Sequence, residues 1–133
     1  MIVAVADTHT VLWHLYGDPK LSAVANEFIC QAVQARQQIV ISSISFVEIV
    51  YLVEKGRISP TAYEDIMQAL TDPEQVFVEA ALSASIVASL RQVSRSEVAD
   101  MPDRIVAATG LYFGVPVISR DRRIRAGSVK TIW

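Results

Sequence analysis

Short runs of consecutive apolar residues alternate along the chain with longer segments in which apolar residues recur every three or four positions. The runs at 2–6 (IVAVA), 38–42 (QIVIS), 75–80 (QVFVEA) and 115–119 (VPVIS) are rich in β-branched residues. Such runs are typical of strands that are buried on both faces of a sheet. A further short run at 129–133 (VKTIW) is expected to form a last strand at the sheet edge.

The segments between these runs have the periodicity and the end signals of helices. Ser22 can cap one helix, Gly56 can end another, and Ser59-Pro60 is typical of a helix start, with serine at the cap and proline in the first turn. Six helices are therefore expected, over 8–16, 22–37, 44–56, a segment that opens at Ser59-Pro60, 83–93 and 100–114.

The helix after Ser22 is amphipathic, and its apolar side is expected to carry Val24, Phe28, Ala32 and Ala35. Cys30 lies in the same pattern and is expected to be a small buried residue. It is the only cysteine, so an internal disulfide is impossible and a reducing, cytoplasmic setting is the simplest inference.

Strands that alternate with helices predict βαβ crossovers and a mainly parallel sheet covered on both faces. The 133 residues, of which 52% are hydrophobic, fit one α/β domain over 1–133 with a full core. No apolar run is long enough to span a membrane, and the N-terminus lacks the basic region of a signal peptide.

The net charge of −2 conceals an uneven distribution along the chain. Residues 1–103 carry six Lys or Arg and thirteen Asp or Glu, which gives −7, whereas residues 104–133 carry six and one, which gives +5. A basic C-terminal segment is compatible with a polyanionic partner, although charge alone favours a solvated basic surface.

Acidic residues follow the predicted strands. Asp7 directly follows 2–6, Glu48 lies about one helical turn beyond 38–42, and Asp121 follows 115–119 by one residue. Asp100 and Asp103 open the helix that precedes the strand at 115–119. In a parallel sheet, functional residues gather beyond the carboxyl ends of the strands, so these side chains are expected to converge at one edge.

Taken singly, each acid also has a structural explanation. Asp7 and Asp100 can cap helices, Asp103 can face a helix dipole, and Asp121 can stabilise a turn. Ser45 and Glu48 have the spacing of a capping box.

Taken together, the acids must either be partly protonated or bind a cation, because carboxylates repel by roughly 4 kcal/mol per pair at about 4 Å and an effective dielectric near 20. A site made of oxygen ligands selects Mg²⁺ or Mn²⁺. Such a site is a common device for cleaving phosphodiesters through an activated water. Arg104, Arg120, Arg122 and Arg123 adjoin the acids in sequence and are expected to bind the substrate backbone.

Four stretches together resemble the motifs of PIN-domain ribonucleases, and in particular the VapC-like toxins of toxin–antitoxin pairs. They are DTHTVLW at 7–13, SFVE at 45–48, DMPDRIVAATG at 100–110 and VPVISRD at 115–121, in order and across nearly the whole chain. The resemblance implies a three-layer α/β/α domain with a parallel sheet. It also implies a Mg²⁺- or Mn²⁺-dependent endoribonuclease.

The resemblance further assigns roles to individual residues. It implies Asp7 and Asp103 as direct metal ligands, and Glu48 and Asp121 as further ligands, directly or through water. Asp100 matches an additional acid of one subset of the family. Thr8 and Ser119 are candidates for hydrogen-bond support of the ligands, and His9 can contact either substrate or protein.

The family also implies partners. Its members commonly form homodimers and are inhibited by a cognate antitoxin that occupies a groove near the acids. The segment 44–70, with Tyr51, Leu52 and Tyr63, is a candidate wall of that groove, although burial in the core explains most of its apolar residues.

The alternatives to a PIN-domain ribonuclease are a HAD-type phosphatase, a receiver domain and a PIN fold without catalytic activity. A HAD-type phosphatase would need a second aspartate two residues after Asp7, where His9 stands. A receiver domain of a phosphorelay would need an aspartate after 75–80 and a lysine near Arg120. A non-catalytic PIN fold that only binds a partner remains an alternative, even though all four acids are present.

Overall fold

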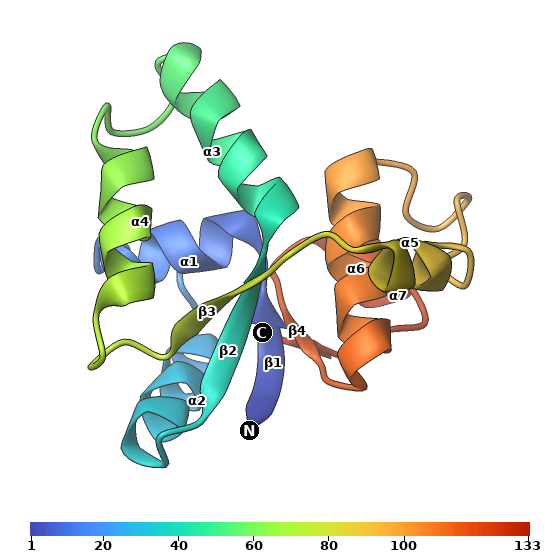
Figure 1. Ribbon diagram of the computed structural model, residues 1–133, viewed down its shortest axis with the longest axis horizontal. Helices are drawn as coiled ribbons and strands as arrows, with labels where there is room; N and C mark the ends of the chain where they lie inside the picture. The colour runs from blue at the N-terminus through green and yellow to red at the C-terminus, as the bar shows by residue number, and fades with distance from the viewer.

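The computed structural model describes residues 1–125 and 127–133 in full and residue 126 by its backbone alone. Its sheet is parallel throughout, with the strand order β3-β2-β1-β4-β5 (Figure 1). The strands are β1 (Ile2–Ala6), β2 (Gln38–Ser42), β3 (Phe77–Ala80), β4 (Val117–Ile118) and β5 (Thr131–Ile132).

Seven described helices connect and flank these strands. They are α1 (Thr8–Leu15), α2 (Ala23–Gln34), α3 (Ser43–Glu54), α4 (Ala62–Thr71), α5 (Ala84–Leu90), α6 (Met101–Phe113) and α7 (Arg122–Ala126). None of the helices described is both long enough and apolar enough to cross a membrane.

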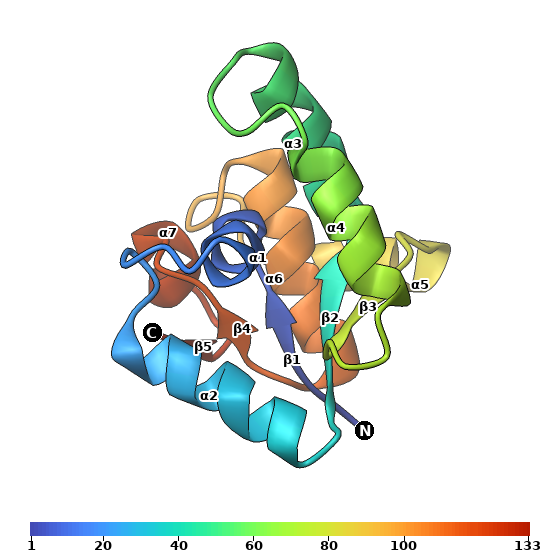
Figure 2. The same cartoon turned by 90° about the vertical axis from the view of Figure 1, so that its left-hand side faces the viewer.

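The sheet separates two hydrophobic cores, as the period of two along each strand requires. In β1, Ala4 and Ala6 face the core formed with α1, α2, α3 and α4, while Val5 faces the core formed with α5, α6 and α7. Figures 1 and 2 show α5, α6 and α7 on one side of the sheet and α1, α2 and α4 on the other. The predicted three-layer α/β/α architecture is confirmed.

The register brings the carboxyl ends of the three inner strands level with one another. Ala6, the last residue of β1, pairs with Ile118, the last residue of β4, and β2 ends beside them at Ser42. The segments that follow these ends begin α1, α3 and α7. The order β3-β2-β1-β4-β5 differs from the 2-1-3-4-5 order of receiver domains, so the receiver alternative is wrong.

The predictions for the start of α4 and for Cys30 were wrong, and one helix was missed. The helix expected to open at Ser59-Pro60 begins at Ala62, because the Ser59 hydroxyl accepts a hydrogen bond from the Thr61 N–H in a turn before the helix. Cys30 is exposed, because α2 turns Ala25, Ile29 and Ala32 toward the core. Helix α7 was not expected at all.

Gly110 sets how closely α6 approaches the sheet. A Cβ at this position would lie 2.9 Å from Val117 Cγ2, 3.0 Å from Val129 Cγ2 and 3.1 Å from the Val115 carbonyl oxygen. Only a residue without a side chain therefore allows α6 to pack this tightly on β4. This packing fixes α6 against β4, the strand that leads to Asp121.

Candidate functional site

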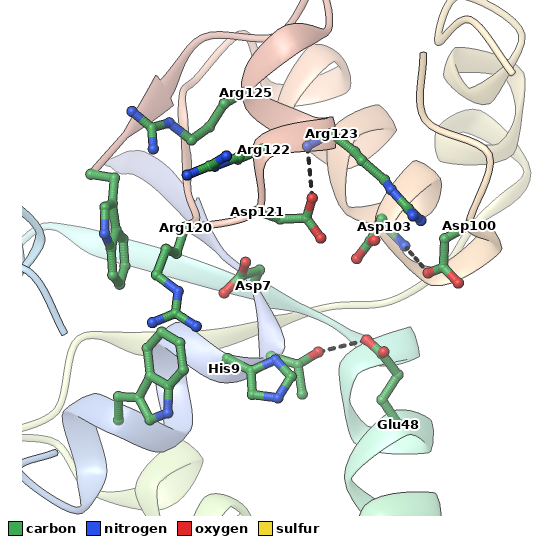
Figure 3. Close-up of a pocket in the computed structure, with 13 residues that line it drawn as sticks. Asp7, His9, Glu48, Asp100, Asp103, Arg120, Asp121, Arg122, Arg123 and Arg125 are labelled. Atoms are coloured by element: carbon green, nitrogen blue, oxygen red, sulfur yellow. Dashed lines mark hydrogen bonds between the residues drawn. The ribbon is translucent and has the colours of Figure 1, made fainter. Parts of the chain in front are cut away.

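A cleft of about 850 Å³ opens beyond the carboxyl ends of β1, β2 and β4. Its lining combines five acids, four arginines, two tryptophans, a histidine and a threonine (Figure 3). The residues are Asp7, Thr8, His9, Trp13, Glu48, Asp100, Asp103, Arg120, Asp121, Arg122, Arg123, Arg125 and Trp133. Five predicted acids thus reach one cleft from segments far apart in the sequence.

Three of these acids are helix caps as well as cleft residues. The Asp7 carboxylate accepts a hydrogen bond from the Thr10 N–H at 2.9 Å, and that of Asp121 accepts one from the Arg123 N–H at 2.8 Å. Asp100 accepts a weaker one from the Asp103 N–H at 3.3 Å. From the sequence, helix capping and a functional role were alternative explanations for these acids. The two are compatible, because each cap uses one carboxylate oxygen and leaves the second oxygen available to a ligand.

Glu48 is held by a threonine rather than by a capping box. Helix α3 is capped by Ser42, so the box predicted between Ser45 and Glu48 does not form. The buried Thr8 hydroxyl instead lies 2.7 Å from Glu48 Oε1 and 2.9 Å from the Ser45 hydroxyl. This contact joins the start of α1 to α3 and orients the Glu48 carboxylate.

Ser119 supports a second acid. Its side chain is fully buried, and its hydroxyl accepts a hydrogen bond from the Asp121 N–H at 3.0 Å. The adjoining Thr10 hydroxyl donates to the Ile118 carbonyl oxygen at 2.9 Å. These bonds fix the backbone from which Asp121 points into the cleft (Figure 3).

Asp103 experiences the strongest electrostatic effect in the cleft. Burial, followed by the negative charges of Asp121, Asp100 and Glu48, raises the pKa of the half-buried Asp103 carboxyl to about 8. Every one of these causes acts in the same direction, so Asp103 gains a proton near neutral pH unless a cation compensates it.

Glu48 shows the same tendency more weakly. Burial is the largest cause that raises its pKa, and the charges of Asp100 and Asp7 add to it. The hydrogen bond from Thr8 and the neighbouring His9 oppose this rise. The acids of four separate segments therefore act on one another, which is the electrostatic condition for a cation site.

The coordination shell itself is not preformed. Among the described residues, no three side chains of His, Cys, Asp or Glu are placed to hold a metal ion. Charge repulsion acts over up to about 10 Å, whereas Mg²⁺ needs each ligand oxygen at about 2.1 Å. The carboxylates can therefore repel one another at distances too long for them to share a metal ion. To be coordinated by three of them, an ion would have to draw them closer together.

The basic side of the cleft comes from the segment around α7. Arg120, Arg122 and Arg123 line the cleft as predicted, and Arg125 joins them. All four side chains are exposed. Figure 3 shows Arg123 extending from α7 toward Asp103 and Asp100. The role of Arg125 was missed, although the repeated arginines of RDRRIR carried the signal.

Arg104 does not line the cleft with the other arginines. Its Nε–H donates to the Val93 carbonyl oxygen at 3.0 Å, and Nη2 donates to the Leu90 carbonyl oxygen at 3.2 Å. These carbonyls lie at the end of α5 and just beyond it, so Arg104 holds that segment against α6. Its predicted contact with substrate is not supported by this placement.

Aromatic residues form a further part of the lining that sequence reasoning missed. The Trp13 ring lies 5.5 Å from that of His9 and 5.8 Å from that of Trp133, measured between centroids. The Arg120 guanidinium carbon stands 4.8 Å from the Trp13 centroid. Trp13 and His9 both lie within the DTHTVLW motif, but Arg120 and Trp133 come from the distant end of the chain.

The chain is similar to known proteins over nearly its whole length. The family model "PIN domain" matches residues 4–129. Ribonuclease VapC22 from Mycobacterium tuberculosis is 24% identical over 126 residues, which cover 95% of this chain and 92% of the relative.

Two solved structures share the fold. A VapBC2 structure from Rickettsia felis, bound to a DNA fragment from its promoter, matches with a TM-score of 0.71 and 14% identity, over 98% of this chain and 97% of the other. A toxin–antitoxin complex from Klebsiella pneumoniae matches with a TM-score of 0.64 and 22% identity, over 98% and 96%.

Proposed function

The chain belongs to the PIN domain family, and we propose that it is a divalent-metal-dependent endoribonuclease that acts as the toxin of a toxin–antitoxin pair. The observation that carries this proposal is the convergence of Asp7, Glu48, Asp103 and Asp121 on one cleft with an arginine-rich side. The ribonuclease named among its relatives supports the same activity.

The carboxylates fit a hard cation by their chemistry. Asp7 and Asp103 are the proposed direct ligands of Mg²⁺ or Mn²⁺, and Glu48 and Asp121 complete the shell directly or through water. Asp100, which is exposed at the cap of α6, is proposed as an additional ligand. The raised pKa of Asp103 supports this assignment, because a cation removes the repulsion that raises it.

When bound, the ion supplies charge stabilisation at the phosphate and lowers the pKa of a water to near neutrality. The protein supplies position: Thr8 orients Glu48 and Ser119 fixes Asp121. Arg120, Arg122 and Arg123 hold the substrate phosphates next to the acids by charge-assisted contacts. Water is available because the cleft is open and polar.

The proposed antitoxin site lies on α3 and adjoins the acidic cleft at Glu48. A smaller groove of about 340 Å³ is lined by apolar residues of α3 and α6 and by Glu48 and Lys55. Three large apolar side chains that line this groove are unusually exposed. They are Val47 at 49%, Tyr51 at 58% and Met101 at 61%. An apolar antitoxin segment in this groove would pass Glu48 and block the cleft. Homodimerisation, implied by the family, stays a prediction for size-exclusion chromatography.

A non-catalytic PIN fold is the second candidate, and the open arrangement of the carboxylates is what favours it. The two candidates make opposite predictions for single carboxylate-to-amide substitutions. A binding module tolerates the loss of one charge, whereas a metal-dependent nuclease does not.

Inducible expression in a bacterial host tests the proposal directly. The wild type is expected to arrest growth and to leave cut RNA, and the neighbouring partner gene is expected to restore growth when co-expressed. Asp7→Asn should abolish both effects, whereas Glu64→Gln, an exposed acid on α4 outside the cleft, should retain them. Normal growth with soluble, folded wild-type protein would contradict the toxin function, and arrest by Asp7→Asn would contradict the site.

A further inference from the structure

Ser45 is a buried polar residue that neither helix capping nor the hydrophobic core accounts for. It lies in the first turn of α3, but the cap of this helix is Ser42. Its side chain is fully buried, and its hydroxyl lies 2.9 Å from the Thr8 hydroxyl. Among the hydrogen bonds of the described residues, this is the one that involves its side chain. The role of Ser45 is therefore tied to Thr8.

The Thr8 hydroxyl has one proton and two acceptors within reach. It is placed to donate to Glu48 Oε1 at 2.7 Å and to Ser45 Oγ at 2.9 Å. Because a hydroxyl carries a single proton, Thr8 can make only one of these bonds fully at a time. The shorter distance and the greater strength of a carboxylate as acceptor favour Glu48. Ser45 is therefore the alternative acceptor of the same proton.

Water is a poor substitute for either acceptor. Thr8 is only 4% exposed, and Ser45 is 0% exposed. A buried donor that loses its partner costs the full desolvation free energy of that group. If Glu48 moved away and the Ser45 hydroxyl were absent, Thr8 would carry this cost.

Coordination of a divalent ion requires Glu48 to move. No three His, Cys, Asp or Glu side chains of the described part of the chain are placed to hold an ion, whereas Mg²⁺ needs each ligand oxygen at about 2.1 Å. Figure 3 shows Glu48 across the cleft from Asp121, with its carboxylate hydrogen-bonded toward α1. A shift of Glu48 toward the other acids would lengthen its bond to Thr8.

We propose that the Thr8 hydroxyl transfers its hydrogen bond from Glu48 to Ser45 when Glu48 moves toward the ion, which makes Ser45 a positioning residue of the metal site. The proposal rests on the proposed metal-dependent function and adds a residue to it. Ser45 contacts neither the ion nor the substrate and acts only through Thr8. With both acceptors present, the buried Thr8 donor stays paired in either position of Glu48.

Removal of the Ser45 hydroxyl is expected to separate stability from metal binding. In EDTA, Ser45→Ala should nearly keep the wild-type melting temperature, because Thr8 still donates to Glu48 and alanine brings no unpaired polar group. Its Mn²⁺ affinity, measured by isothermal titration calorimetry, should fall by about 5- to 150-fold, which is the cost of one unpaired buried donor. A serine that only held α1 against α3 would instead lower the melting temperature when replaced.

Two further variants serve as controls. Ser43→Ala removes a hydroxyl of the same helical turn that accepts a hydrogen bond from the Leu82 N–H and does not line the cleft. Its Mn²⁺ affinity should equal that of the wild type. In the Thr8→Val background, Ser45→Ala should weaken Mn²⁺ binding no further, because the donor through which Ser45 acts is gone.

A thermal double-mutant cycle in EDTA tests the two acceptors without any metal. Glu48→Met keeps a side chain of similar length and removes the carboxylate. Ser45→Ala and Glu48→Met each leave Thr8 one acceptor, whereas the double variant leaves it none. The melting temperature of the double variant should therefore fall below the sum of the two single changes, and Thr8→Val should abolish this excess.

Additive changes of melting temperature in EDTA would overturn the shared donor. An unchanged Mn²⁺ affinity of folded Ser45→Ala would overturn the role of Ser45 in metal binding, and the nuclease proposal would stand if Asp103→Asn still loses metal-dependent cleavage. Failure of the proposed function has a different signature, because the wild type itself would then bind no Mn²⁺. That result would also remove the purpose of the transfer, and the cycle in EDTA would still decide whether Glu48 and Ser45 share the Thr8 proton.

Discussion

Replacing Asp103 by asparagine is expected to stabilise the protein in the absence of divalent metal. The raised pKa means that the folded state binds a proton at Asp103 that the unfolded chain has already released. Between the model value of 3.8 and about 8, folding therefore carries an additional proton. Stability falls as the pH rises through this window and stays constant above it. Asparagine does not titrate, so the stability of the variant does not fall with pH in this window through residue 103.

The size of the effect follows from the shift. A change from 3.8 to about 8 corresponds to an upper bound of roughly 6 kcal/mol at 1.36 kcal/mol per unit. Asp103 is only half-buried, and solvent screening reduces this bound to about 2 kcal/mol. Asparagine also loses the favourable interaction of a first-turn carboxylate with the dipole of α6, which reduces this gain by about 0.3–1 kcal/mol. A net gain of about 1–2 kcal/mol raises the melting temperature by about 3–10 °C.

The assay is thermal unfolding in EDTA at pH 5 and pH 8.5, followed by the same scans with Mg²⁺ or Mn²⁺. Asp103→Asn should exceed the wild type most at pH 8.5, and added metal should stabilise the wild type but not Asp103→Asn. Glu64→Gln is the matched control, because Glu64 is a first-turn acid on α4 outside the cleft. A variant that is destabilised equally at both pH values would refute the argument from clustered charge.

Three further perturbations test separate parts of the account. Gly110→Ala should lower the melting temperature, with a cost of about 1–3 kcal/mol, because its Cβ would stand 2.9 Å from Val117 Cγ2. Thr8→Val should cut the cleavage rate by about 10- to 100-fold and move the acid limb of the pH–rate profile upward, because Thr8 lowers the pKa of Glu48. Arg104→Met should lower the melting temperature without changing KM for RNA, because its guanidinium donates to backbone carbonyls; a raised KM with unchanged stability would restore Arg104 to the substrate site.

The position of the acids was predictable because it follows from topology. Apolar runs such as IVAVA are typical of strands buried on both faces, and strands of that kind belong to parallel sheets, in which their carboxyl ends meet at a common edge. Asp7, Glu48 and Asp121 each follow one of these runs, so their convergence needed no knowledge of loops. That Asp7 and Asp121 also cap helices shows that the two explanations weighed for each acid were not exclusive.

Local features that depend on tertiary contacts were predicted less well. The inward face of α2 was predicted to carry Val24, Phe28, Ala32 and Ala35. Ala32 is buried and Phe28 packs against the core, but Val24 is 58% exposed, Ala35 is exposed, and the helix buries Ala25 and Ile29 instead. Neighbouring alanines and valines define the apolar side too weakly to fix the rotation of a helix. The segment RRIRA, with three arginines among its five residues, gave no helical signal, and α7 begins there because Asp121 caps it.

The contact between Trp13 and Trp133 illustrates a further limit. Trp13 and Trp133 are separated by nearly the whole chain, and the pairing of β5 with β4 at the sheet edge is what brings the chain end to α1. No periodicity within one segment encodes such a contact. The same holds for Arg104, whose partners lie on α5 and in the loop that follows it.

The most direct test of the central claim is the rate of cleavage at one mapped RNA site as a function of Mn²⁺ concentration, measured with purified protein. The wild type and Glu64→Gln should share one metal-dependent rate curve and lose all cleavage in EDTA. Asp103→Asn, folded and more stable without metal, should show no cleavage at any concentration. Cleavage by Asp103→Asn at the wild-type rate, or cleavage that persists in EDTA, would contradict a metal-dependent nuclease site at these carboxylates.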